Sequence, residues 1–371
     1  MMPKTVVHLI TGLTKAGAET MLYQILKYRQ NKELNYKIIS LGGGHYYEET
    51  MRELGYEVIV LDFQRHPLSG FICLCRELRG ADTLCCWMYH ANLIGYLAAR
   101  RAGVERVVWG IRHTDLNPVH NKTLTLRINQ ICARWSKNVS AILYNGNRAR
   151  ALHEAAGYCR EKGFVVDNGC NCDEYRADEA AAQSLRDELN IPAEKQIILA
   201  VTKDIPSKDI PNFLRAFGIL CKQNDKLTAI LCGAGVDADN ARISALCREV
   251  GLEIGKDVFL LGVRHDVPRL LAACDLYVLH SAGGEAFPNA LLQAMACGCV
   301  CVTTDVGDAR RILNHDDCVV PPDEPEALAA KITELLALPE EAASVIRCEN
   351  RARVRKNFDI REIVKQYEEK F

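Results

Sequence analysis

The sequence predicts an α/β protein built from two doubly wound parallel sheets, each in its own domain. Its 371 residues are too many for one comfortable core and suit two domains. Short apolar runs alternate with helical patterns along the chain, which is typical of parallel sheets covered by helices on both faces. Ligands in such sheets bind at the carboxyl ends of the strands, so the residues that follow each run are candidates for chemistry.

The strand-like runs divide between two halves of the chain. Those of the first half are residues 5–10, 36–41, 57–61, 82–89, 106–111 and 141–145. Those of the second half are residues 162–168, 196–201, 227–233, 258–262, 275–280 and 300–305. Helices are expected at 178–191 and 358–371, the second because its apolar residues recur at helical spacing. We therefore predict domains of residues 1–165 and 166–354, and the terminal helix, about 355–371, is a candidate to pack back on the first domain.

The composition indicates a cytoplasmic globular protein. No apolar run reaches the roughly 18 residues of a membrane-spanning helix, and the amino-terminal segment is more typical of a first strand than of a signal peptide. The 17 cysteines are then expected to be reduced thiols. Cys297, Cys299 and Cys301 lack the spacing of a zinc site. We expect Cys299 and Cys301 in the core, and we assign no metal ion.

Charge is distributed unevenly between the two halves. Residues 1–165 contain 22 lysines and arginines against 13 aspartates and glutamates, a net charge of +9, whereas the remainder has 24 against 34, or −10. A basic half indicates an anionic partner, such as a membrane surface, a phosphorylated acceptor or nucleic acid. Residues 119–138 mix lysines and arginines with apolar residues. This helix could dock on an anionic membrane, or it could be an internal helix with a solvated basic face.

Three strand ends of the first half carry candidate residues. A helix opens near Gly17, where bare backbone amides attract phosphate and the glycine permits close approach. The glycines at 12 and 17 do not complete a dinucleotide fingerprint, and a tight turn without a ligand is the alternative. Polar clusters follow two further strands, and at least one is expected to line a cleft. They are His90 with Asn92, and Arg112 with His113.

Two lysines follow the first long strand of the second half. Lys203 and Lys208 lie close together outside a helix, which costs repulsion unless an anion such as a diphosphate sits between them. Two solvated surface lysines are the alternative. Asp237 and Asp239 resemble a metal-holding pair, but acids at a helix start more often cap its amides.

Residues 283–312 contain the densest group of candidates. Glu285 lies in a loop, Pro288 suits a first helical turn, and the amides of Asn289, Ala290 and Leu291 are then expected to point outward with the helix dipole behind them. Phosphate would bind there, with Glu285 beside it to meet hydroxyl groups. A buried strand-to-helix turn without a ligand is the alternative.

Taken together, these segments resemble the family-4 retaining glycosyltransferases of the GT-B fold, in which two Rossmann-like domains face each other across a cleft. Residues 283–312 are similar to the family's E-G-F-P-x-x-x-x-E-A-M-A-x-G run. Further similarity extends over nearly the whole chain, at residues 8–19, 166–175, 201–209 and 258–281.

The resemblance implies a role for each matching residue. Lys203 and Lys208 would neutralise the leaving diphosphate, while Glu285 and His113 would contact the donor sugar. The residues implied to hold the nucleotide and its phosphates are Gly17, Val263, Arg264, Phe287, Asn289, Ala290, Leu291 and Gln293. The candidates on the acceptor side are His90, Asn92 and Arg112.

Five positions depart from the family's pattern, among them Asn171, where the family usually has an aspartate, and Cys299, where a leucine-like residue is usual. Ala16 replaces the first glycine of the amino-terminal loop, Lys203 replaces an arginine, and Gln293 replaces the second acid of the E-x7-E pair. A glutamine keeps a carbonyl acceptor for a ribose hydroxyl. Glu285 and Lys208 are retained, so we predict an active enzyme.

The predicted function is retaining transfer of a sugar from a nucleotide-sugar donor, most simply a UDP-sugar, to a saccharide or lipid-linked acceptor. The nucleotide-sugar is a co-substrate, and neither a cofactor nor a metal ion is expected, because cations and amides can stabilise the departing diphosphate. The expected location is cytoplasmic, peripheral to the inner face of the membrane, with no nucleic-acid partner. A sugar-nucleotide-binding scaffold without activity and a sugar-nucleotide 2-epimerase are the alternatives.

Overall fold

The computed structural model describes residues 3–14, 16–43, 46–118 and 121–371. It divides the chain into two compact units, each described by itself below. The first unit comprises residues 1–169 together with 360–371, and the second comprises residues 170–359. The division therefore falls four residues beyond the predicted boundary at 165, and the carboxyl-terminal helix is part of the first unit.

The first unit contains a parallel sheet of seven strands in the order β3-β2-β1-β4-β5-β6-β7. The strands are β1 (Lys4–Ile10), β2 (Leu34–Ser40), β3 (Glu57–Val60), β4 (Thr83–Trp87), β5 (Arg106–Ile111), β6 (Ala141–Tyr144) and β7 (Gly163–Val165). The first six lie where the apolar runs predict them. The run at residues 162–168, grouped above with the second half, instead provides β7 of the first sheet, because Gly163 pairs with Ile142 of β6. An apolar run alone does not reveal which sheet it joins.

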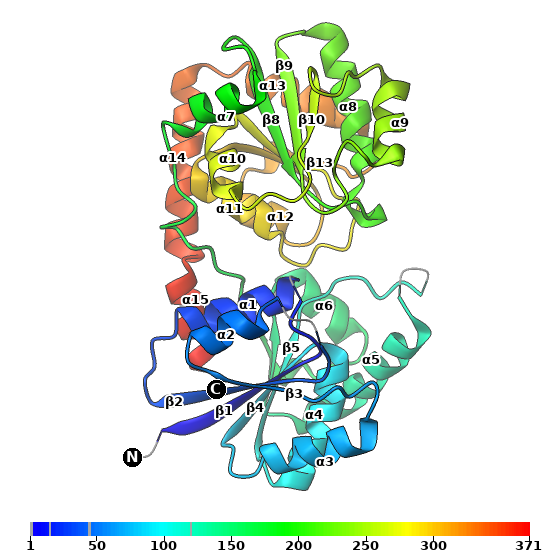
Figure 1. Cartoon of the computed structure of the whole chain (residues 1–371), viewed down its shortest axis with the longest axis vertical. Coiled ribbons are helices and arrows are strands. Elements are labelled where there is room, and N and C mark those ends of the chain that lie inside the picture. Colours follow the sequence, from blue (N-terminus) through cyan, green and yellow to red (C-terminus); the bar gives the residue numbers. More distant parts are fainter. Residues whose placement is uncertain (1–2, 15, 44–45, 119–120) are drawn as a thin grey trace. The chain divides into compact units, whose positions relative to one another are not determined.

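Helices cover both faces of this sheet. They are α1 (Gly17–Lys27), α2 (Glu48–Glu53), α3 (Pro67–Glu77), α4 (Met88–Ala102), α5 (Thr123–Trp135), α6 (Asn147–Ala155) and α15 (Ile360–Glu368). Right-handed crossovers place α1 and α2 on one face, and α3, α4 and α5 on the other (Figure 1). Helix α15 packs beside α1, while α4 packs against both α3 and α5.

Helix α15 is held on the sheet by its apolar face and by polar anchors in its last turn. Ile360, Ile363, Val364 and Tyr367 are buried. The hydroxyl of Tyr367 accepts a hydrogen bond of 2.7 Å from Arg112, and the carboxylate of Glu368 accepts bonds from the backbone amides of residues 30 and 31. The amphipathic pattern seen in the sequence thus forms a core contact within the first unit.

The second unit contains a parallel sheet of six strands in the order β10-β9-β8-β11-β12-β13. The strands are β8 (Gln196–Val201), β9 (Leu227–Cys232), β10 (Val258–Leu260), β11 (Leu276–Leu279), β12 (Val300–Thr304) and β13 (Val319–Val320). The helices are α7 (Ala181–Leu189), α8 (Ile210–Gln223), α9 (Ala241–Val250), α10 (Val267–Ala273), α11 (Asn289–Cys297), α12 (Ala309–Leu313), α13 (Pro325–Leu336) and α14 (Glu340–Asn357). The sequence does not predict β13, because two residues are too few to show a periodicity.

The predicted burial of the strand cysteines is confirmed. Cys299 and Cys301 are 2% and 1% exposed and belong to the apolar core of the second unit. All 17 cysteines are free thiols. Across the described part of the chain, no helix is long and apolar enough to cross a membrane.

Candidate functional site

Each sheet has one place where the strand order reverses. In the first sheet this place lies between β1 and β4, and in the second it lies between β8 and β11. The loops that follow such a pair of strands turn to opposite sides, which leaves a crevice where ligands bind in open α/β sheets. In the second unit these two loops are residues 202–209 and 280–288. They carry Lys203, Lys208 and Glu285.

Lys208 and Glu285 form an ion pair in this crevice. Lys208 ends a short 3-10 helix after β8, and its ammonium group donates to the carboxylate of Glu285. The hydroxyl of Ser281 donates to the same carboxylate oxygen at 3.0 Å. Ser281 is itself buried, and its carbonyl accepts a bond of 2.7 Å from the hydroxyl of Thr304. The carboxylate is therefore oriented by two donors from different strand ends.

Backbone contacts hold the Glu285 loop against its neighbours. The amides of Ala282 and Gly283 donate to the carbonyl of Ser207 at 2.9 and 3.3 Å. Gly307, in the loop after β12, has a φ of +52°, and a Cβ atom there would lie 2.3 Å from the carbonyl oxygen of Glu285. Only glycine fits such a left-handed position so close to another backbone. The loops after β8, β11 and β12 are thus locked together.

Helix α11 begins directly behind this loop. Pro288 occupies its N-cap position and no side chain caps the helix. The amides of a first helical turn have no acceptor within the helix, and the helix dipole favours an anion there. Asn289 and Ala290 are half-buried at this turn, and Gln293 is half-buried one turn further on. The helix start can therefore receive phosphate oxygens.

Two candidates at this turn have side chains that are committed to the core. Leu291 is fully buried. The ring of Phe287 is 4% exposed and packs edge-on against Phe358, with centroids 5.7 Å apart. Both can contribute to a ligand only through the backbone.

Lys203 differs from Lys208 in its surroundings. It lies two residues beyond the end of β8, its side chain is exposed, and no carboxylate pairs with it among the described residues. An exposed lysine at the edge of a crevice can turn toward an anion with little cost in desolvation. Lys203 is therefore available to a ligand, while Lys208 must first leave Glu285.

Arg264, predicted to lie beside the nucleotide base, is part of an ion-pair network. Its guanidinium donates to Glu188 at 2.7 Å and to Asp266 at 2.8 Å, and Arg269 pairs with the same two carboxylates. The network ties α7 to α10, so a contact with a base would cost these bonds. The neighbouring Val263 is 58% exposed and remains open to a ligand.

The network makes the stability of the second unit depend on pH. Hydrogen bonds from Arg264 hold the pKa of the Asp266 carboxyl well below its usual range. A carboxyl with a lowered pKa in the folded state stabilises the fold above its unfolded pKa of about 3.9, and this contribution is lost as the pH falls. Asp266→Asn is expected to lower the free energy of unfolding by about 1 kcal/mol at neutral pH, since partial exposure weakens the pairs. Urea unfolding at several pH values checks this, and a difference that stays constant below pH 4 would contradict it.

Two sequence features near the site have structural explanations. Gly233 has a φ of +140°, and a Cβ atom there would lie 1.7 Å from the carbonyl oxygen of Thr202. The start of α9 is capped by the side chain of Asn240, which accepts from the amides of residues 242 and 243. The expectation that Asp237 and Asp239 cap this helix is therefore wrong, because the cap lies one residue later.

In the first unit, Gly17 is the first residue of α1 and lies at the reversal point of the sheet. A Cβ atom at Gly17 would meet no atom within 4 Å, and its φ is not in the left-handed region. The fold itself therefore does not require a glycine here. A ligand that approaches the backbone closely would explain why a glycine stands at position 17.

The side chains of two candidate residues of the first unit make contacts within that unit. Arg112 donates to Tyr367 and to Asn168 and lies over the ring of Trp87. Asn92 is fully buried in α4, and its amide, once reoriented, donates to carbonyls of residues 86 and 88. The prediction that these two side chains face an acceptor is therefore not supported by their positions.

His90 and His113 remain at least partly accessible. His113 follows β5 and is half-buried, and His90 lies in the first turn of α4. Burial lowers the pKa of His90, with a smaller contribution from Lys122. A neutral imidazole can accept or donate a hydrogen bond to a sugar hydroxyl.

Sequence reasoning missed Ser281 and Met88. Ser281 shows no signal in the sequence because its role depends on a contact with Glu285. Met88 has a φ of +70° directly after β4, an unusual conformation for a residue with a side chain. Such outliers often occur at functional sites.

Comparison with known proteins agrees with this geometry. Residues 182–354 match the family model described as "Glycosyl transferases group 1". A putative glycosyltransferase, EpsF of Bacillus subtilis, is 23% identical over 81% of this chain and 79% of its own length. These matches support a glycosyltransferase. The group 1 match covers the whole crevice of the second unit, including Lys203, Lys208 and Glu285.

Two further relatives extend the likeness beyond that unit. N,N'-diacetylbacillosaminyl-diphospho-undecaprenol alpha-1,3-N-acetylgalactosaminyltransferase of Campylobacter jejuni is 24% identical over 79% of each chain. The crystal structure of HepE of Anabaena in complex with UDP superposes with a TM-score of 0.86, at 22% identity over 98% of each chain. The predicted GT-B fold with two Rossmann-like units is thus confirmed.

Proposed function

We propose that this protein is a retaining glycosyltransferase that moves a sugar from a UDP-sugar to a saccharide or lipid-linked saccharide without a metal ion. One observation carries the proposal. At the reversal point of the second sheet, Lys208 and Glu285 meet beside the uncapped start of α11. A cation, a helix start and a carboxylate are the groups that a diphosphate linked to a sugar requires.

Each group has a proposed task. Lys208 and Lys203 bind oxygens of the diphosphate, and the amides of Asn289 to Leu291 bind the same anion. Glu285, released from Lys208 by the phosphate, accepts hydrogen bonds from hydroxyls of the donor sugar. Gln293 meets a ribose hydroxyl, and Val263 lies beside the base.

The reaction follows from this placement. The bond between the anomeric carbon and the diphosphate oxygen breaks, and a bond to the acceptor oxygen forms on the same face of the sugar. The proton of the acceptor hydroxyl passes to the departing diphosphate oxygen. Positive charge and amides aimed at that oxygen stabilise the transition state, so the protein needs no carboxylate nucleophile. In the first unit, Gly17 and His113 are proposed to contact the diphosphate and the donor sugar.

The choice of donor and acceptor rests on two relatives. HepE of Anabaena was crystallised with UDP. The Campylobacter jejuni relative is named for an acceptor sugar linked to diphospho-undecaprenol. We propose that this chain uses the same classes of molecule, at the cytoplasmic face of a membrane, where the thiols of its 17 free cysteines would stay reduced.

The variant Gly17→Ala tests whether the glycine is required for ligand binding or for folding. Alanine at the first position of α1 meets no neighbour and is a better helix former than glycine. We therefore expect an unchanged or slightly raised Tm and UDP binding weakened about tenfold or more, as a methyl group blocks the approach of phosphate to the backbone. Calorimetry with UDP and thermal unfolding check both expectations. A variant that binds UDP normally would show that Gly17 is only a turn residue.

The proposed reaction is tested with the purified protein, a set of nucleotide sugars and saccharide or lipid-linked acceptors, with a chelator present. We expect nucleotide release that requires an acceptor, a product with retained anomeric configuration by NMR, and no loss of rate in the chelator. An inverted product or a requirement for a divalent cation would refute those parts of the proposal. Interconversion of sugar nucleotides without an acceptor would identify an epimerase, and binding without turnover would identify a scaffold.

A further inference from the structure

A surface pocket of about 500 Å³ lies between α4 and α5 of the first unit, away from the site described above. It is lined by Tyr96, Leu97, Arg100, Arg101, Trp135 and Asn138. They lie in the last two turns of α4, at the end of α5 and just after it, shortly before β5 and β6 begin, so the pocket lies near the amino ends of those strands. Gly17 and His113 lie at the opposite, carboxyl edge of the same sheet. The pocket is therefore separate from the proposed donor site.

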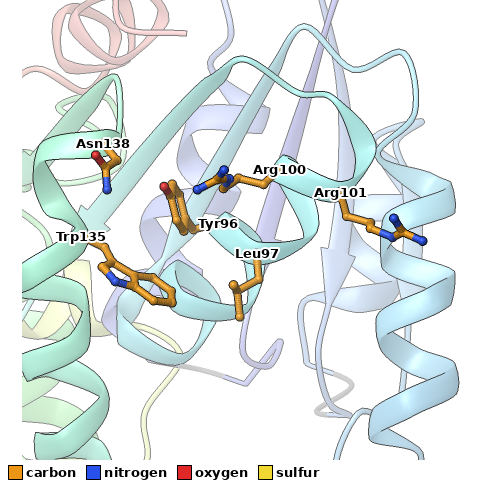
Figure 2. A pocket seen from close by; sticks show the side chains of 6 residues that line it. All are labelled: Tyr96, Leu97, Arg100, Arg101, Trp135 and Asn138. Carbon is orange, nitrogen blue, oxygen red and sulfur yellow. The ribbon is translucent and has the colours of Figure 1, made fainter.

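The pocket combines aromatic walls with cationic groups. The ring of Trp135 lies 5.5 Å from that of Tyr96, which in turn contacts the buried Trp109. Figure 2 shows Arg100 extending over Tyr96, whereas Arg101 leaves α4 on the other side. Both arginines are exposed, and neither has a carboxylate partner in the part of the chain that the structure describes. Such a pocket suits a ligand with an anionic group and an apolar part.

The helices around the pocket expose aliphatic side chains. Leu68 and Ile72 of α3 are 82% and 70% exposed, Leu97 of α4 is 42% exposed, and Leu124 of α5 is 64% exposed. These three helices pack side by side on one face of the sheet. Exposed aliphatic residues are common on protein surfaces when they occur singly, so these four carry weight only together with the charge of the same helices.

The same three helices are strongly basic. Their only acid is Glu77, which is already paired with Lys37 at 2.8 Å. Their basic residues are Arg76, Arg100, Arg101, Arg127 and Arg134. All but Arg76 lack a carboxylate partner among the described residues. The face thus presents uncompensated positive charge beside exposed aliphatic groups.

We propose that the face formed by α3, α4 and α5 docks on an anionic lipid bilayer and that the pocket between α4 and α5 holds the phosphate of one lipid. Arginines attract the anionic headgroups, and the exposed leucine and isoleucine side chains enter the boundary of the acyl chains. The sequence predicts a membrane contact through α5 alone. The structure extends it to three helices and assigns it a lipid pocket.

A bilayer explains this face better than nucleic acid does. Single-stranded nucleic acid is bound by exposed aromatic rings on which bases stack. Here the most exposed apolar residues are aliphatic, and Tyr96 is buried to 7% exposure. Aliphatic side chains gain free energy from hydrocarbon but little from a sugar-phosphate backbone.

Trp135 gives a direct readout at the pocket. Of the three tryptophans, Trp87 and Trp109 are 1% and 0% exposed, whereas Trp135 is half-buried at the pocket wall. Vesicles of phosphatidylcholine and phosphatidylglycerol are prepared with brominated acyl chains, which quench tryptophan fluorescence on contact. We expect the full-length protein to sediment with these vesicles at low salt and its fluorescence to be quenched. Trp135→Phe should remove the quenching while leaving sedimentation nearly unchanged.

The charge contribution is tested with matched double variants. Arg100→Gln with Arg101→Gln is expected to weaken vesicle binding about tenfold or more, because each basic residue near the surface contributes about fivefold. Lys222→Gln with Lys226→Gln removes the same charge from exposed sites in the second unit and should bind normally. Thermal unfolding confirms that each variant folds. No substrate is used, so the outcome is independent of the proposed reaction.

Several results would overturn the proposal. They are absence of binding to phosphatidylglycerol vesicles, equal binding by the two double variants, and quenching that survives Trp135→Phe. Displacement of the vesicles by millimolar inorganic phosphate would show that the pocket takes free phosphate instead of a lipid. Displacement by a single-stranded oligonucleotide would assign the face to nucleic acid.

Discussion

Replacing Lys208 with glutamine is expected to lower kcat/KM for sugar transfer by about 10²–10³-fold, the usual cost of removing one preorganised group that stabilises a developing oxyanion. The physical reason is the loss of the cation that meets the departing diphosphate. Glutamine keeps a donor near Glu285, whose carboxylate also retains the hydroxyl of Ser281. The variant should therefore fold. Steady-state kinetics with saturating acceptor, together with thermal unfolding, measure both properties.

Two further variants make the result specific. Lys203→Gln should have a smaller effect, since its side chain is exposed and is not held beside Glu285. Lys222→Gln removes an exposed lysine of α8 and should leave transfer unchanged. Transfer by the Lys208 variant within about threefold of wild type would show that this lysine is a structural partner of Glu285 and not a ligand of the diphosphate.

Gly307→Ala is expected to lower the free energy of unfolding by about 2–4 kcal/mol and to abolish measurable donor binding. The added Cβ would lie 2.3 Å from the carbonyl oxygen of Glu285 and 2.9 Å from that of Ala286, at a φ of +52°. Both contacts are with backbone, so the Glu285 loop must move. Urea unfolding and calorimetry with UDP measure the two effects.

Gly251→Ala is the matched control for this change. Gly251 also has a positive φ, +81°, but a Cβ atom there would meet nothing within 4 Å. Gly251→Ala should lower the free energy of unfolding by only about 1 kcal/mol, the cost of placing a side chain at a positive φ, and should bind the donor normally. Equal destabilisation by the two substitutions would show that the contact between Gly307 and the Glu285 loop adds no strain.

The sequence predicts the strands of both sheets well because each is a short apolar run that ends in a turn or a polar cluster. It also predicts that Lys208 and Glu285 belong to one site, and the structure places them in contact. The sequence predicts this because the resemblance implies that both residues meet the donor at the ends of strands, and the structure shows that these two strands flank the reversal of strand order. The position of the site on the sheet is set by the order of the strands and not by any single residue.

Other features depend on contacts that no local pattern records. Arg264 stands where the resemblance implies a contact with the nucleotide base, yet its guanidinium pairs with Glu188 of α7, 76 positions away in the sequence. Asn92 lies in a polar cluster but points into the core. Arg112 is occupied by Tyr367, at the far end of the chain. For Arg264 and Arg112 a partner distant in the sequence occupies the side chain, whereas Asn92 is occupied by its burial and by carbonyls of residues 86 and 88.

The most direct test of the central claim is calorimetric titration of UDP, GDP and ADP into the wild-type protein and into Lys208→Gln, with a chelator present. The crevice between the loops after β8 and β11 should give saturable binding of one nucleoside diphosphate, with UDP favoured, and the affinity should fall at least tenfold in the variant. Absence of binding by the wild-type protein, or equal affinity in both proteins, would contradict the assignment of this crevice as the donor site.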